Sequence, residues 1–111
     1  MIIYKIFRAE EWQALQSRGE TLGAPVDLAD GYVHFSTAAQ AAETAAKYFA
    51  GIEGLMLLAV EADTCAGLKW EPSRGGALFP HLYRALRMDD VLWARPLPVK
   101  AAGHVFPDGM L

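Results

Sequence analysis

The feature that most constrains the fold is a continuous apolar run, Leu55–Val60, bounded by Gly54 and Asp63. Such a run has no polar face, so it fits the interior of a structure better than its surface. It is short for a helix and far too short to cross a bilayer, which takes about 20 residues. The run therefore predicts a central β-strand that is covered on both faces.

The residues before this strand predict a strand, a helix and a loop. Ile2–Phe7 is dense in β-forming residues and predicts a first strand. A helix is expected to start near Glu10, since acidic residues suit a first turn, and to end near Gly19. Residues 19–31 contain three glycines and Pro25 and are expected to be mostly loop.

A second strand and a second helix are expected next. Tyr32–Ser36 alternates polar and apolar residues, which predicts a strand with its three polar side chains on one face. Thr37 with Gln40 three residues later fits a capping box. An alanine-rich helix is therefore expected to run up to Phe49.

The last third of the chain predicts further strands. Leu68–Glu71 reads as a short strand, and the conformation of Phe79–Tyr83 stays open. Val91–Val99 predicts a late strand, which two prolines restrict to the edge of a sheet. The order of the elements predicts an α+β fold, with two main helices packed on a small mixed or antiparallel sheet.

The composition is typical of one globular domain spanning residues 1–111. Hydrophobic residues make up 53% and charged residues 21% of the chain. The formal net charge is −3 with scattered cations, so no nucleic-acid partner is expected. Cys65 is the one cysteine, which excludes an internal disulfide. Ile2–Phe7 is too short for a signal peptide, and we expect no membrane segment and a cytoplasmic location.

His34 is the first candidate functional residue. It lies in the middle of a predicted strand that leads into a helix N-terminus, where anionic ligands are favoured. An imidazole at such a position offers both a donor and an acceptor. The simpler interpretation is a half-buried strand histidine whose hydrogen bonds go to the backbone.

Four more candidates follow in the second half of the chain. Glu71 lies next to an indole, Trp70, which can raise the pKa of a carboxyl group and suit it to acid–base catalysis. His81 and Tyr83 share a face if the backbone is extended, and together suit stacking on a planar ring. Arg84 is suited to binding phosphate. The simpler interpretations are a solvated strand end, packing in a turn and an exposed arginine. The spacing of the histidines and the cysteine does not indicate a metal site.

Three motifs give the chain a resemblance to a known family. They are Gly31–Ser36 (GYVHFS), Leu68–Glu71 (LKWE) and Phe79–Tyr83 (FPHLY). With these motifs, in this order, the chain resembles the domain of unknown function 952 family over about residues 3–97. It departs from the family pattern at two positions. Lys5 stands where the family often has histidine, and Arg84 stands where it often has glycine.

The resemblance implies a fold and a ligand, although the family has no established activity. Its fold is thought to be similar to ADP-ribosyltransferases and RNA 2′-phosphotransferases, whose histidine strand resembles the segment with His34 and Ser36. His34 would then hold a ribose hydroxyl of NAD. Tyr83 would stack on nicotinamide, and Glu71 would stabilise an oxocarbenium-like transition state. The implied partner is a nucleotide-like small molecule, with NAD as substrate and no metal.

Two alternatives stay open at this point. The chain could be a non-enzymatic module that binds a small ligand through the same residues. It could also act on a phosphate ester, which would need cations around His34. All of these hypotheses require His34 to face a concave pocket within direct or one-water reach of Glu71, His81 or Tyr83.

Overall fold

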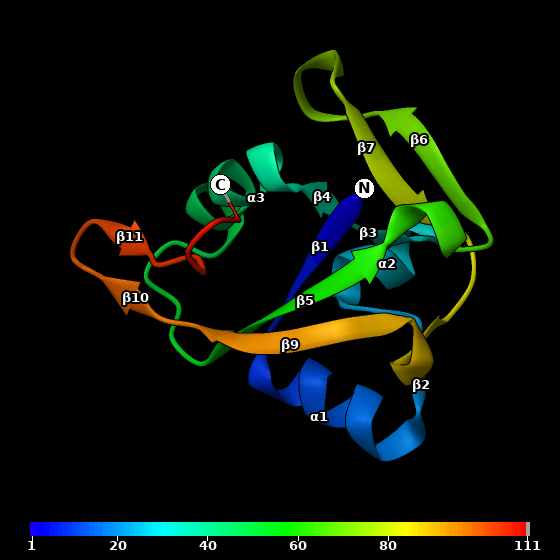
Figure 1. Ribbon diagram of the computed structural model, residues 1–111, viewed down its shortest axis with the longest axis horizontal. Coiled ribbons are helices and arrows are strands. Elements are labelled where there is room, and N and C mark those ends of the chain that lie inside the picture. Colours follow the sequence, from blue (N-terminus) through cyan, green and yellow to red (C-terminus); the bar gives the residue numbers. More distant parts are fainter. Residues whose placement is uncertain (111) are drawn as a thin grey trace.

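A four-stranded sheet lies at the centre of the computed structural model, which describes residues 1–110 (Figure 1). Its strand order is β4-β1-β5-β9, and every pairing within it is antiparallel. These strands are β1 (Ile2–Phe7), β4 (Ser36–Thr37), β5 (Leu55–Glu61) and β9 (Val91–Leu97). The apolar run is thus an inner strand, and the proline-bearing β9 is at the edge, as predicted.

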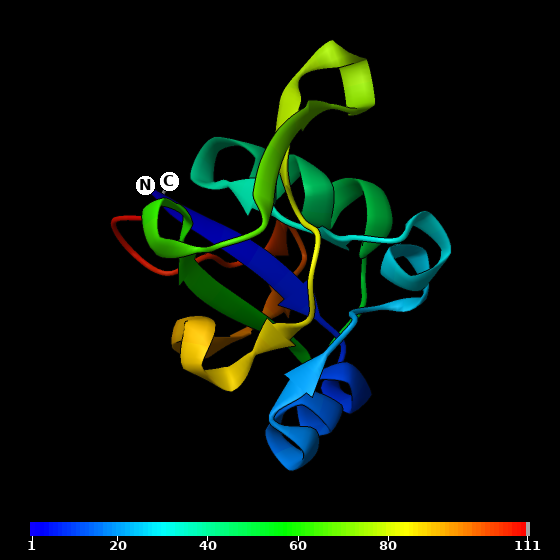
Figure 2. The ribbon, with the colours of Figure 1, turned by 90° about the vertical axis from the view of Figure 1, so that its right-hand side faces the viewer.

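A second, three-stranded sheet has the order β3-β7-β6 and is also antiparallel. Its strands are β3 (Val33–His34), β7 (Leu78–Leu82) and β6 (Leu68–Pro72). The β6–β7 hairpin extends away from the rest of the molecule in both views (Figures 1 and 2). Two small pairs complete the strands: β2 (Glu20–Thr21) with β8 (Leu86–Arg87), and β10 (Val99–Lys100) with β11 (Gly103–His104).

Three α-helices are described: α1 (Ala9–Arg18), α2 (Pro25–Asp30) and α3 (Ala38–Tyr48). Helix α1 ends at Gly19, whose φ of 79° is the left-handed conformation that glycine adopts without strain. The predicted capping box of α3 is confirmed, because Thr37 and Gln40 bond to each other's backbone N–H. Short 3₁₀ turns lie at Ala62–Thr64, Arg74–Gly76 and Met88–Asp90.

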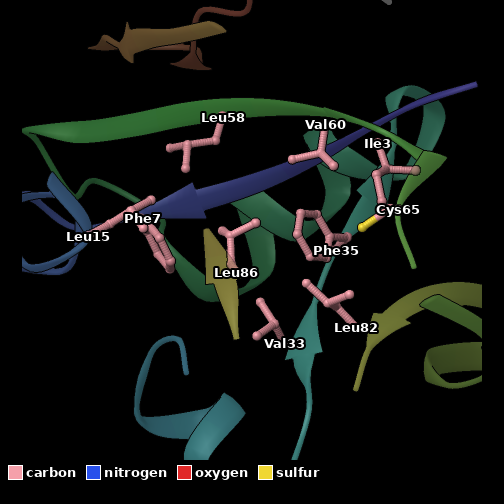
Figure 3. Close-up of a cluster of buried hydrophobic side chains, with 10 residues drawn as sticks. All are labelled: Ile3, Phe7, Leu15, Val33, Phe35, Leu58, Val60, Cys65, Leu82 and Leu86. Atoms are coloured by element: carbon pink, nitrogen blue, oxygen red, sulfur yellow. The ribbon is translucent and has the colours of Figure 1, made fainter. Parts of the chain in front are cut away.

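Both faces of the inner strand β5 are covered, as the apolar run predicted. On one face, Ile3 and Phe7 of β1 pack with Leu58 and Val60 of β5 and with Leu15 of α1 (Figure 3). The other face of the same two strands contributes a second buried cluster, which includes Ala45 of α3. Strand β5 is therefore covered on both sides, which explains why its sequence has no polar alternation.

The expectation of a loop over residues 19–31 was wrong, because α2 and β2 lie within it. Pro25 occupies the first turn of α2, where its missing N–H costs nothing. The carboxylate of Asp27 accepts a hydrogen bond from the N–H of Ala24, and Gly31 ends the helix with a φ of 86°. The proline and the glycine therefore mark the two ends of a short helix and not the body of a loop.

The single strand expected over Tyr32–Ser36 is divided between the two sheets. β3 pairs with β7, and β4 pairs with β1. Between them, the N–H of Phe35 donates to the carbonyl of Pro80. The chain therefore crosses from one sheet to the other at this point. No helix within residues 1–110 is long and apolar enough to cross a membrane.

Candidate functional site

Five side chains from β3, β6 and β7 and their flanking residues meet on one face of the three-stranded sheet. We call Tyr32, His34, Glu71, His81 and Tyr83 the Tyr–His–Glu cluster. His34 and His81 are direct cross-strand partners, as are Val33 and Leu82. The latter pair lies in the core, so the alternation of a strand turns both histidines to the opposite face.

Ring contacts hold this cluster together. Tyr32 stacks on His81 with ring centroids 4.2 Å apart and planes inclined by 25°. The ring centroids of Tyr32 and Tyr83 lie 5.1 Å apart. The rings of His34 and His81 meet edge to face, with their centroids 5.3 Å apart. Aromatic pairs at these separations stabilise each other beyond the burial of their area.

One carboxylate oxygen of Glu71 receives two donors. The Nδ1 of His81 lies 2.9 Å from Oε1, and the hydroxyl of Tyr83 donates to the same atom at 2.5 Å. The hydrogen bonds from Tyr83 and then His81 lower the pKa of Glu71. This corrects the expectation that the indole of Trp70 would raise that pKa, because hydrogen bonds to the charged form dominate.

The same contact changes Tyr83. Its hydrogen bond to Glu71 raises the pKa of Tyr83 to about 12, since ionising the phenol would place two negative charges together. The ammonium of Lys69 lies 5.0 Å from the centre of the Tyr83 ring. The contact with Glu71 keeps the phenol neutral, and the residue is 42% exposed at the surface of the cluster.

His34 is bound by two carboxylates. Its Nδ1 lies 2.6 Å from Oδ1 of Asp27, and its Nε2 lies 2.9 Å from Oδ2 of Asp30. The backbone N–H of His34 also donates to Asp27 Oδ1 at 3.0 Å. These bonds fix the orientation of the ring.

Asp27 is the centre of a buried network that sequence reasoning missed. Its Oδ2 accepts from the Nζ of Lys5 at 2.8 Å, and both side chains are almost fully buried. Burial alone would raise the pKa of Asp27, but His34 and then Lys5 lower it overall. Burial lowers the pKa of Lys5, against the opposing charge of Asp27. The position of Asp27 two residues after Pro25 signals a first helical turn, where acidic residues are favoured, but nothing local signals its contact with Lys5.

His81 has one ring nitrogen without a partner. Only 2% of the residue is exposed, and among the described residues its Nε2 has no hydrogen-bond partner. Unpaired buried polar atoms are rare in folded proteins, because a buried donor or acceptor without a hydrogen bond costs about 1–3 kcal/mol of stability. Each such atom needs an explanation.

Two candidate residues lie outside the cluster. The hydroxyl of Ser36 is 3.0 Å from that of Thr44 on α3, because β4 belongs to the other sheet. Arg84 makes a bidentate ion pair with Asp90 and also donates to the carbonyl of Ala66. Its guanidinium is therefore bound to the protein, away from His34. Ser36 was expected to join the site because a continuous strand would place it on the same face as His34, and Arg84 because a guanidinium suits phosphate; the structure brings neither to the cluster.

Two surface cavities lie elsewhere on the molecule. One of about 720 Å³ lies between α3 and the β10–β11 hairpin, and one of about 440 Å³ lies between α1 and α2. Neither is lined by a residue of the cluster. The concave pocket beside His34 stays a prediction. Within residues 1–110, no group of three His, Cys, Asp or Glu side chains is placed to hold a metal ion.

Comparisons with known proteins agree with this fold. The family model described as "Protein of unknown function (DUF952)" matches residues 6–94. The crystal structure of protein CC0527 from Caulobacter crescentus is 50% identical, with a TM-score of 0.89 over 94% of this chain and 92% of that one. The solution NMR structure of the same protein is 51% identical, with a TM-score of 0.83 over 93% and 90%. No curated protein matches.

Proposed function

Because the chain belongs to the DUF952 family of proteins of unknown function, we propose a function from its cluster: it binds NAD or a related nucleotide. The observation that carries this proposal is the meeting of Tyr32, His34, Glu71, His81 and Tyr83 on one sheet face. These residues come from three separate segments, so nothing in the local sequence requires them to be neighbours.

Exposed aromatic surface supports the binding of a planar ring. Tyr83 is 42% exposed, and Tyr32 stands beside it at 5.1 Å between ring centroids. A nicotinamide or adenine ring can stack on such a surface, and stacking on an aromatic side chain contributes about 1–3 kcal/mol per base. The resemblance of the His34 strand to that of ADP-ribosyltransferases supports the same ligand.

Glu71 supports a catalytic extension of the proposal, the transfer of ADP-ribose. Its lowered pKa keeps the carboxylate ionised, with a negative charge beside an exposed ring. A carboxylate in this position can stabilise the positive charge that develops on a ribosyl carbon as nicotinamide leaves. Glu71 would then be the catalytic residue. His34, whose ring nitrogens lie against Asp27 and Asp30, would hold a ribose hydroxyl only after the exposed Asp30 carboxylate moves away from Nε2.

The environment of His34 speaks against the phosphate-ester alternative. Its two ring nitrogens face the carboxylates of Asp27 and Asp30. No lysine or arginine whose side chain is described makes an ion pair or hydrogen bond directly to this ring, and Lys5 contacts it only through Asp27. Like charges repel, so two carboxylates do not favour a phosphate at this position.

Isothermal titration with NAD, ADP-ribose and nicotinamide tests the binding step. We expect heat of binding with NAD or ADP-ribose, weakened at least about fivefold by Tyr83→Ala. Glu53→Ala, at an exposed residue outside the cluster, serves as the control and should bind like the native chain. The absence of heat and of competition at millimolar ligand would refute the proposal.

The variant Glu71→Gln separates a transferase from a binding module. Nicotinamide release from NAD is measured beside affinity, with Glu53→Gln as the matched control. A transferase should lose turnover with little change in affinity, because a glutamine side chain keeps the shape of the carboxylate but not its charge. Binding with no release by the native chain would favour the non-enzymatic module.

A further inference from the structure

Resting on the proposed function, we propose that His81 is the residue that recognises the ribosyl part of the ligand. Its Nε2 would accept a hydrogen bond from a ribose hydroxyl, while Glu71 holds the ring in the tautomer that makes this possible. The proposal changes the role of Glu71 in binding. In ligand binding, Glu71 acts as a positioning residue for His81, in addition to any charge that it stabilises in the transfer step.

The tautomer follows from the chemistry of Glu71. Its carboxylate is ionised and can only accept, so the Nδ1 of His81 must donate across their 2.9 Å contact. The hydroxyl of Tyr83 donates to the same oxygen and helps to hold it in place. A neutral imidazole with its proton on Nδ1 presents a lone pair at Nε2. That nitrogen is therefore an acceptor.

Burial makes this acceptor informative. His81 is 2% exposed, and its Nε2 meets no donor among the described residues. The other histidine of the cluster differs, because both nitrogens of His34 are engaged by carboxylates. The Nε2 of His81 is an oriented acceptor without a donor, so a donor group of a ligand can form the missing hydrogen bond. Completing it removes the cost of the unpaired atom.

The groups around His81 select the class of ligand. Three carboxylates belong to or contact the cluster, from Asp27, Asp30 and Glu71. Together with an acceptor at Nε2, these carboxylates suit hydroxyl donors and disfavour a phosphate or carboxylate group beside His81, while the ammonium of Lys69 lies against Tyr83. The ring faces of Tyr32 and Tyr83 suit a base or a sugar. The matching ligand part is a nucleoside, and the phosphates of a dinucleotide would lie outside the cluster.

Access to His81 requires movement of one surface side chain. Tyr32 lies over the imidazole, and Tyr83 is 42% exposed beside it. Exposed side chains change rotamer in picoseconds to nanoseconds. Tyr32 is half-buried, so a ligand ring takes its place over His81 only when the Tyr32 side chain changes rotamer.

The tautomer and the contact are both measurable by two-dimensional NMR of histidine ring nitrogens in the native chain. Without ligand, we expect His81 to carry its proton on Nδ1. In Glu71→Ala we expect the Nε2–H form to appear, whereas Glu71→Gln, whose amide oxygen still accepts, should preserve the Nδ1–H form. Adding ADP-ribose should shift the Nε2 resonance, and inorganic pyrophosphate should leave it unchanged.

Affinity gives a second measurement. His81→Phe retains a ring for Tyr32 but has no acceptor, and should weaken ADP-ribose binding about tenfold. His104→Phe is the matched control, since His104 bonds to the carbonyl of Ile52 outside the cluster. Its affinity should be that of the native chain.

The outcomes separate this inference from the proposed function. If ADP-ribose binds but the Nε2 resonance does not move, or if His81 carries its proton on Nε2, this inference fails and nucleotide binding stands. If neither NAD nor ADP-ribose binds the native chain, both fail together. Pyrophosphate that shifts Nε2 as ADP-ribose does would overturn the preference for the nucleoside part.

Discussion

Replacing Asp27 by asparagine should destabilise the fold more than any other single change of a charged residue in the buried network. Asp27 is fully buried and joins four groups: the N–H of Ala24, the N–H and Nδ1 of His34, and the ammonium of Lys5. An asparagine can still accept from the backbone. It cannot neutralise Lys5, whose side chain is only 7% exposed in the core.

The size of the effect follows from that orphaned ammonium. Removing one partner of a buried ion pair costs about 3–5 kcal/mol. Lys5 can escape by losing its proton, which from an ordinary pKa of 10.5 costs about 5 kcal/mol at pH 7 and sets an upper limit. A loss of about 3–5 kcal/mol is a large part of the roughly 5–15 kcal/mol typical of a domain. It corresponds to a fall in Tm of about 12–20 °C.

Urea unfolding followed by tryptophan fluorescence measures this loss, with the exposed Asp89→Asn as control. The double variant Asp27→Asn/Lys5→Met should recover at least half of it, because the unpaired charge is gone. The pKa of Asp27 is lowered in the folded chain, so its contribution is present above the ordinary value of 3.8 and disappears as the pH falls through the folded pKa. The native chain and Asp27→Asn should therefore converge in acid. A loss below about 1 kcal/mol, or no recovery in the double variant, would refute the reasoning.

Three further predictions follow from the site and the core. Tyr83 should ionise at about pH 12 when followed by ultraviolet absorbance, and Glu71→Gln should move this pKa towards 10. Because the pKa of Tyr83 is raised in the folded chain, the stability that its hydrogen bond contributes is present below pH 10 and is lost as the pH rises to 12. An unmoved titration would contradict the contact. Arg84→Ala should leave the affinity for ADP-ribose within about twofold of the native value by titration calorimetry. The reason is that the guanidinium is bound to Asp90 and the Ala66 carbonyl and not to the cluster. A larger change would show that Arg84 contributes to ligand binding. Leu58→Ala should cost about 2–5 kcal/mol in urea unfolding and Leu92→Ala, which is 56% exposed, under about 0.5; equal losses would contradict the core described above.

The sequence by itself determined the elements whose signals are local. Leu55–Val60 could only be an inner strand, because its apolar residues leave no side for water. Thr37 and Gln40 specified the start of α3, since a capping box involves residues three apart. The same local chemistry is ambiguous at Pro25 and Gly31, because both residue types occur in loops and at helix ends alike, and a short helix was missed there.

The tertiary structure alone decided which candidates meet. Ser36 is two residues from His34 yet lies in the other sheet, whereas His81 is distant in sequence and pairs with His34 across two strands. Asp27 gave no sign that it would bind Lys5, because that contact depends on where α2 docks against β1. The pKa of Glu71 likewise followed the donors that folding brought to it and not the neighbouring indole. Strand register and helix docking depend on how the whole core is buried, so short sequence patterns cannot predict them.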